Sequence, residues 1–245
     1  MIYITGDTHG EWMSRLNTNA FPEQKEMTKD DYVIIAGDFG IWHDTNQERY
    51  NLNWLEGKPF TTLFIDGNHE NMDRLYAMPV SEWHGGKVHF IRPSVIHLMR
   101  GQIFNIESKT FWTFGGASSH DIRDGILEID DPRIKKWRYM SSKQFRVNHL
   151  SWWKEEMPSD EEMEEGRKNL ENINNKVDFI VTHCGPTSSM ALYSHGGYKP
   201  DILTKYFEEI HQKVDFKKWF IGHYHANYAI NDKEIILYEQ IVRIV

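Results

Sequence analysis

Short apolar runs that each end in a cluster of Asp, Asn or His recur along the chain. The run at 32–36 is too short for a globular helix and rich in β-branched residues, so we predict a parallel strand covered on both faces. It leads into Asp38, and Gly37 and Gly40 allow the backbone to turn sharply on either side of that carboxylate. The same pattern predicts strands at 2–5, 62–65, 179–181 and 219–221.

Each of these strands is followed by residues able to bind a ligand. The clusters lie at 6–10, 37–38, 67–70, 182–186 and 222–225. In open α/β sheets, ligands bind beyond the carboxyl ends of the strands. We therefore expect the clusters to meet at one site.

The segments between these strands have helical and antiparallel patterns. We predict helices beginning near Glu11, after Asp44 with a face that includes Tyr50 and Leu55, and at about 71–76, 159–173 and 200–212, the fourth with a Ser159–Glu162 capping box. Alternating runs separated by turn residues predict antiparallel strands over 82–114 and after residue 227. We predict a polar, flexible loop at 185–197 and expect the tail to be structural only.

The segment 117–158 lacks a sheet period and contains Trp137, Trp152 and Trp153. Long irregular segments within a compact domain are typically lids or binding loops. We predict a single domain over 1–245 with a cap insertion at about 117–158. The alternative is an insertion that packs on the side of the domain.

Composition limits the class of protein. A hydrophobic content of 40% supports a globular core, and no run is long enough to span a membrane. The single cysteine and the absence of a leader pattern favour the cytoplasm. A net charge of −8 does not favour nucleic acid as a partner, because phosphate backbones are bound by clustered Lys and Arg.

Seven residues of the strand-end clusters supply two carboxylates, one amide oxygen and four imidazoles. This mixed nitrogen and oxygen set suits Mn, Fe, Zn or Ni better than Ca²⁺, and seven ligands exceed the needs of one ion. If Asp38 bridges, two divalent ions about 4 Å apart would share a water that attacks phosphorus in line. The candidate ligands are Asp7, His9, Asp38, Asn68, His183, His223 and His225.

In this order, the motifs Asp7-x-His9, Gly37-Asp38, Gly67-Asn68-His69-Glu70, His183 and Gly222-His223-x-His225 resemble the calcineurin-like metallophosphoesterase superfamily. The resemblance implies an α/β fold: a four-layer αββα sandwich with mixed sheets and a dinuclear site at the strand ends. It also implies that one metal takes Asp7, His9, Asp38 and His225. The other would take Asp38, Asn68, His183 and His223.

The resemblance further implies catalytic roles for Asp38, Asn68 and His69, with His69 contacting phosphate or protonating the leaving oxygen. Protein phosphatases of this superfamily carry an Asp and an Arg shortly after the bridging Asp, whereas Phe39-Gly40-Ile41-Trp42 follows Asp38 here. A residue from elsewhere would then supply the missing substrate contact. The candidates are His120, Arg123 and His195, and His43 is either a further residue of the substrate pocket or a surface histidine.

These features predict a metal-dependent hydrolase of phosphate esters, with attack by a metal-bridging hydroxide in line with the leaving oxygen. The substrate is expected to be a small molecule or a nucleotide, with monoesters and diesters both open. The alternatives are a nuclease or cyclic-nucleotide phosphodiesterase of the same superfamily, and a metal-stabilised binding module without turnover.

Overall fold

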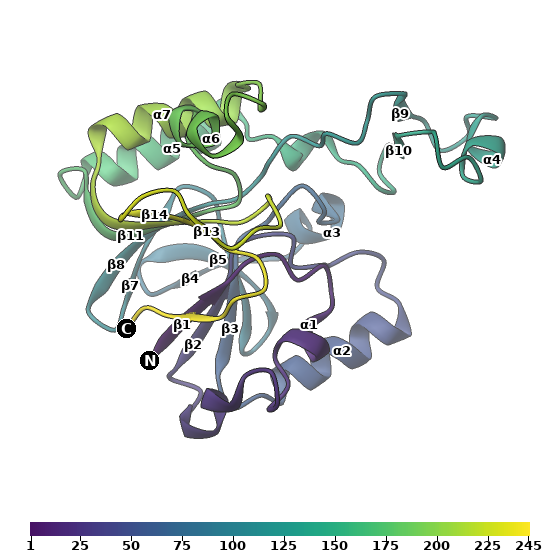
Figure 1. Cartoon of the computed structure of the whole chain (residues 1–245). Helices are drawn as coiled ribbons and strands as arrows, with labels where there is room; N and C mark the ends of the chain where they lie inside the picture. The colour runs from purple at the N-terminus through teal and green to yellow at the C-terminus, as the bar shows by residue number, and fades with distance from the viewer.

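The computed structural model describes residues 1–245 and contains two β-sheets packed face to face, with helices on both outer faces (Figure 1). The first sheet has the order β15-β1-β2-β3-β6-β5-β4, and the second has the order β13-β14-β12-β11-β8-β7. A two-stranded sheet, β9-β10, stands apart. The predicted four-layer αββα sandwich is confirmed.

The strands are short and mostly buried, as the apolar runs predict. The first sheet comprises β1 (Ile2–Thr5), β2 (Tyr32–Ile35), β3 (Thr61–Phe64), β4 (Val80–Trp83), β5 (Gly86–Arg92), β6 (Val95–Leu98) and β15 (Val242–Arg243). The second comprises β7 (Gln102–Ile106), β8 (Lys109–Phe114), β11 (Lys176–Thr182), β12 (Asp215–Ile221), β13 (Tyr228–Ala229) and β14 (Glu234–Ile236).

Helices cover the outer faces of the two sheets, α1 and α2 on one side and α5, α6 and α7 on the other (Figure 1). The bounds are α1 (Trp12–Arg15), α2 (Asn46–Glu56), α3 (Met72–Tyr76), α4 (Ile134–Trp137), α5 (Asp160–Glu171), α6 (Thr187–Ser194) and α7 (Ile202–Lys213), with 3-10 turns η1 (Pro22–Glu26) and η2 (Lys154–Glu156). The predicted capping box between Ser159 and Glu162 opens α5, and Asp201 opens α7 in the same way. No helix combines the length and apolar character that crossing a bilayer requires.

Three hydrophobic clusters separate the layers. The first lies between the sheets and includes Ile34, Val181 and Phe220. The second packs α1 and α2 on the first sheet, and the third packs α5, α6 and α7 on the second. Because the central strands are buried on both faces, their sequences are continuously apolar and do not alternate.

Parallel pairing brings the polar clusters together. β1, β2 and β3 are parallel neighbours, as are β8, β11 and β12. Their carboxyl ends therefore lie at one edge of the sandwich, where the loops carry Asp7, Asp38, Asn68, His183 and His223.

Some predicted pairings and loops differ in the structure. The β5–β6 and β7–β8 hairpins are antiparallel as predicted, but β6 also pairs parallel to β3, and β8 pairs parallel to β11. The prediction of a flexible loop over 185–197 is wrong over most of its length, because residues Thr187–Ser194 form α6. Its apolar residues Met190 and Tyr193 pack on the second sheet, which stabilises a helix in a serine-rich sequence.

Residues 117–158, which we call the arm, leave the body beyond β8 and return through η2. The arm carries β9 (Gly125–Leu127), α4 and β10 (Phe145–Val147), which extend sideways from the sandwich (Figure 1). Its two ends lie beside the loops that hold the polar clusters. Its role as a cap stays a prediction.

Candidate metal centre

The structure brings all seven predicted ligands to one place. The ligand atoms of Asp7, His9, Asp38 and His225 lie within 4.8 Å of one another, and so do those of Asp38, His183 and His223. Asp38 belongs to both groups. Asn68 Oδ1 lies 3.3 Å from His183 Nε2 and so adjoins the second group.

Unusual backbone geometry turns these side chains toward one another. His9, Asp38, His223 and His225 have φ angles of 47°, 43°, 67° and 47°, in the left-handed region. Non-glycine residues there cost on the order of 1–3 kcal/mol each and persist where the surrounding structure enforces them. The backbone is therefore strained at four of the seven ligands, which lowers the stability of the fold but orients their side chains.

Two glycines allow the loops to approach closely. A Cβ atom on Gly37 would lie 2.0 Å from His183 Nδ1, and one on Gly67 would lie 2.0 Å from Asp38 Oδ1. The Gly37 backbone also has a φ of +97°. Only glycine fits at these positions while His183 and Asp38 stay in place.

His183 places a ring nitrogen among oxygen acceptors in the second group. Its Nδ1 lies 2.9 Å from the Ala36 carbonyl oxygen, an acceptor, so Nδ1 carries the proton. Its Nε2 then faces Asp38 Oδ1 at 3.4 Å and Asn68 Oδ1 at 3.3 Å, which are also acceptors. The Nε2 lone pair would face the lone pairs of two oxygens. This repulsion is relieved only when a proton or a metal lies between the three atoms.

The surrounding charges agree with this reading. Burial would lower the pKa of His183, but the Asp38 and Asp7 carboxylates outweigh it and raise that pKa to about 10. Burial and the neighbouring His183 lower the pKa of His223 to about 3, so His223 is the neutral imidazole that metals bind. A divalent cation suits the position that a proton otherwise takes on His183.

The first group has a similar convergence of atoms without donors between them. Asp7 Oδ1 accepts the backbone N–H of His223 at 2.9 Å, while the buried Oδ2 lacks a hydrogen bond of normal geometry. His225 Nε2 lies 3.1 Å from Asp7 Oδ2, and His9 Nε2 lies 3.1 Å from His225 Nε2. Two imidazole nitrogens and a carboxylate oxygen around one point fit a divalent metal.

Cys184 follows His183 but takes no part in the ligand set. Its side chain is 2% exposed and belongs to the core under α6 and α7. Burial raises the pKa of its thiol, which makes it a poor nucleophile and a poor ligand. The donors at the centre are therefore nitrogen and oxygen.

His69 and Glu70 follow Asn68 along the chain and make different contacts. The backbone N–H of His69 donates to Asp38 Oδ1 at 2.9 Å, and its ring lies 5.5 Å from the His9 ring. Burial lowers the pKa of His69. Glu70 points inward and accepts backbone N–H groups of Gly40 and Gly67, which ties two ligand loops together.

The arm supplies a hydrogen-bond chain behind Asn68 that the sequence did not indicate. Asn68 Nδ2 donates to Ser119 Oγ at 3.3 Å, and Ser119 Oγ donates to Glu156 Oε2 at 2.6 Å. All three residues are buried. Because the hydroxyl proton goes to Glu156, Ser119 accepts from Asn68 and keeps Asn68 Oδ1 turned toward His183.

Replacing Ser119 with Ala tests this chain. The Asn68 amide would lose its partner and rotate more freely, so we expect divalent-metal affinity to fall about 10- to 100-fold, as for other residues that orient ligands. Calorimetric titration with Mn²⁺ measures the effect. Ser118→Ala, a neighbour outside this chain, serves as the control, and equal affinity in both variants would contradict the role.

The predicted substrate contacts are not all near the centre. The His120 ring lies 5.9 Å from the His223 ring and lines the cavity over the ligands. His43 lines a separate cavity, Arg123 bonds the Ser142 carbonyl within the arm, and His195 is an exposed residue that ends α6. Of the four, the structure brings His120 to the centre.

Arg146 of β10 is a cation beside His69 that sequence reasoning missed. It forms a two-pronged ion pair with Asp121 at the base of the arm. Burial is the main cause of the lowered pKa of His69, and Arg146 lowers it further while Asp38 opposes the shift. Nothing in the spacing of arm residues singles out Arg146, since the arm brings it near only through folding.

The tail, which we expected to be structural only, also supports a ligand. The Tyr238 ring stacks on His225 with 4.6 Å between centroids and 16° between planes. The Tyr238 carbonyl accepts the backbone N–H of Gly6 at 3.1 Å, just before Asp7. The tail therefore fixes two loops of the first group.

Comparisons with known proteins agree with this architecture. Residues 1–227 match the family of calcineurin-like phosphoesterases. The chain is 24% identical to the lariat debranching enzyme of Drosophila pseudoobscura pseudoobscura and to lariat debranching enzyme A of Xenopus laevis, in each case over 93% of this chain and 43% of the relative. The Homo sapiens enzyme is 22% identical over 93% of this chain and 42% of its own length.

The chain thus spans less than half the length of these relatives. Among solved structures, it is similar to phosphopantetheinyl hydrolase (PptH) from Mycobacterium tuberculosis, with a TM-score of 0.48, 15% identity and coverage of 97% of this chain and 87% of that one. The match to the family covers all seven ligand positions. The chain belongs to the calcineurin-like phosphoesterases, a family of metal-dependent phosphoester hydrolases.

Proposed function

We propose that the chain hydrolyses phosphate esters at a dinuclear site with Asp38 shared between the ions. The observation that carries the proposal is that two ligand groups share Asp38. In each group, the ligand atoms lie within 4.8 Å of one another. Asp7, His9, Asp38 and His225 would hold one ion. Asp38, Asn68, His183 and His223 would hold the other.

Divalent ions at these ligands supply Lewis acidity and activate a water for in-line attack at phosphorus. The protein holds the ligands rigidly through strained turns, the Glu70 contacts and the Ser119 chain. We infer Mn, Fe, Zn or Ni as the metals, because the donors are imidazole and carboxylate. The compartment, expected to be the cytoplasm, stays a prediction.

His69 is placed to act on the substrate side of the centre. It lines the cavity of about 240 Å³ over the ligands together with His120, His223 and His225. From there it would contact the phosphate or protonate the leaving oxygen. Arg146 lowers the pKa of His69 while its ion-pair partner Asp121 opposes that effect, so Arg146 would act as a substrate cation only after leaving Asp121.

His69→Gln tests the general-acid role. Removing a positioned acid typically costs about 10²- to 10⁴-fold, and the cost is smaller when the leaving group needs no proton. We therefore expect a loss of this size for an alkyl phosphoester and a much smaller one for a p-nitrophenyl ester. The kcat values of the two substrates give the comparison, and equal losses would point to phosphate binding instead.

A phosphodiester within a nucleic acid is a second candidate substrate. The similarity to lariat debranching enzymes over 93% of the chain favours it. The net charge of −8 favours a small ester instead. Salt-dependent binding of single-stranded RNA would support a nucleic-acid substrate. A failure to bind this RNA at low salt would exclude it.

Turnover decides between hydrolysis and a binding module without activity. The Mn²⁺-loaded protein is expected to cleave a chromogenic phosphomonoester or phosphodiester, and the ratio of the two rates assigns the ester class. A protein that holds two ions and cleaves no ester in a broad panel of small and nucleotide substrates would refute the proposed function.

A further inference from the structure

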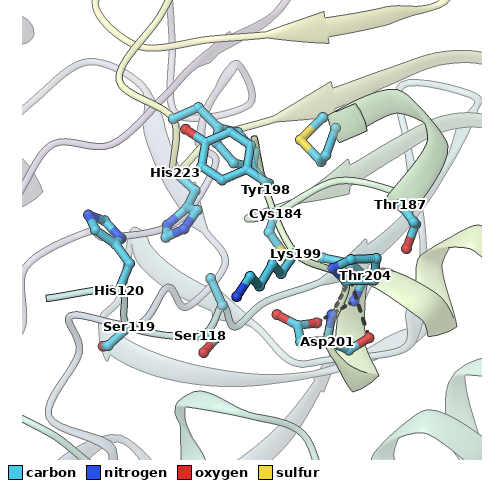
Figure 2. A pocket seen from close by; sticks show the side chains of 14 residues that line it. Ser118, Ser119, His120, Cys184, Thr187, Tyr198, Lys199, Asp201, Thr204 and His223 are labelled. Atoms are coloured by element: carbon cyan, nitrogen blue, oxygen red, sulfur yellow. Dashed lines mark hydrogen bonds between the residues drawn. The ribbon is translucent and has the colours of Figure 1, made fainter. Parts of the chain in front are cut away.

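A second cavity opens beside the metal centre (Figure 2). It has a volume of about 360 Å³ and lies where the base of the arm faces the turn into α6 and the start of α7. We call it the tyrosine cavity. It shares His120, Tyr198, His223 and Tyr224 with the cavity over the ligands. A group bound in it would therefore lie next to an ester phosphorus at the metals.

One wall of the tyrosine cavity is aromatic. The Tyr198 side chain is 48% exposed, so part of its ring is free to contact a ligand. The Tyr224 ring, which also lines the cavity, lies 5.0 Å from it at an angle of 53°, and the Tyr193 ring lies 6.5 Å away at 14°. A ring backed by other rings loses little freedom when a planar ligand stacks on it.

Other residues that line the cavity offer both hydrogen-bond donors and acceptors. In Figure 2 the Lys199 side chain extends toward the part of the cavity where Ser118 and His120 lie. The Asp201 carboxylate also lines the cavity, and only its Oδ1 is used to cap α7, by accepting the Thr204 N–H at 2.7 Å. Thr187 Oγ1 is buried with no hydrogen-bond partner.

This combination matches a nucleobase with its sugar. A base has a flat face for an aromatic side chain and an edge that carries donors and acceptors, which a cation, a carboxylate and hydroxyls can bind. An acyl chain would use neither Lys199 nor Asp201. A simple alkyl substituent would not use the Tyr198 face.

We infer that the tyrosine cavity binds a nucleoside substituent of the phosphoester. The inference rests on the proposed function, and it names the substrate class as small nucleotide esters. Tyr198 would stack on the base, and Lys199 and Asp201 would contact its edge. His120 lies between the two cavities and would contact the sugar–phosphate junction.

Three p-nitrophenyl esters, assayed in the presence of Mn²⁺, test the inference. Each releases p-nitrophenolate, and the three differ only in the substituent that stays on phosphorus. They are methyl p-nitrophenyl phosphate and the p-nitrophenyl esters of thymidine 5′-phosphate and glucose 6-phosphate. Base stacking on an aromatic side chain contributes enough that its removal is expected to cost about 10- to 100-fold. Tyr198→Ala should therefore lower kcat/KM for the thymidine ester by about that factor more than for the methyl ester.

Two further variants separate stacking from folding. Tyr198→Phe keeps the ring and should retain the preference for the thymidine ester. Tyr228→Ala removes a half-exposed tyrosine that contacts Tyr193 but does not line the cavity, so it should leave the preference unchanged. Lys199→Gln should lower the preference without abolishing it.

Equal losses for all three esters in Tyr198→Ala would overturn the inference while leaving the proposed hydrolysis intact. A preference for the glucose ester over the thymidine ester in the wild type would overturn it too. If the wild type cleaves no ester, the proposed function fails and binding decides the inference. Calorimetry with thymidine 5′-phosphate should then show affinity at least about tenfold weaker in Tyr198→Ala than in Tyr198→Phe, and equal affinities would overturn it.

Discussion

Asp38→Asn is expected to lower phosphoesterase kcat at least about a thousandfold, the largest effect of any single substitution at the centre. Asp38 contributes an oxygen to both ligand groups. Removing its negative charge therefore weakens the binding of both ions. Metal-derived stabilisation of the transition state amounts to several kcal/mol, and about 1.4 kcal/mol corresponds to tenfold in rate.

The substitution keeps the local fold, because an Asn side-chain oxygen can still accept the N–H of His69. Turnover of a p-nitrophenyl ester, metal content by elemental analysis and thermal unfolding should be measured together. Asp44→Asn is the matched control, since Asp44 is an exposed carboxylate paired with Arg49. Full metal content with unchanged turnover in Asp38→Asn would refute the role of Asp38.

Arg100→Leu is expected to destabilise the chain by about 3–5 kcal/mol, because it would strand a buried carboxylate. Arg100 is 4% exposed and Asp66 is fully buried. Arg100 donates to Asp66 Oδ2 through Nη2 at 2.6 Å and through Nε at 2.9 Å, while His97 Nε2 lies 3.1 Å from Oδ1. Burial would raise the pKa of Asp66, but Arg100 and His97 hold it well below its usual range.

Urea unfolding of the wild type and the variant gives the difference in free energy. Arg133→Leu, at an exposed Arg–Asp pair on the arm, should leave the urea midpoint nearly unchanged. Asp66→Asn combined with Arg100→Leu removes the unpaired charge, so we expect the double variant to recover part of the loss. A double variant less stable than Arg100→Leu would show that a different contact dominates.

The central strands and the ligand positions were predictable from the sequence because both follow from local pattern. A strand covered on two faces is apolar throughout, as at 32–35, and a polar cluster at its end marks the ligand edge. Asp7, His9, Asp38 and the later ligands therefore converge as the pattern predicts. The hairpins over 86–114 also follow from alternation and turn residues.

The remaining features depend on contacts between distant segments. The parallel pairing of β8 with β11 joins strands more than 60 residues apart, and no local pattern encodes it. The helix α6 forms because Met190 and Tyr193 pack on a sheet, although it contains several serines and is flanked by glycines. Ser119, Glu156 and Arg146 reach the centre only because the arm leaves and returns beside it.

The stacking of Tyr238 on His225 has a consequence for biosynthesis. The ligands begin at Asp7 in the first loop, while the ring that holds His225 and the carbonyl that holds Gly6 come from the tail. A nascent polypeptide cannot close this arrangement until Tyr238 has left the ribosome. The first ligand group would therefore be completed late in synthesis, and a chain released before residue 238 would lack the ring that packs on His225.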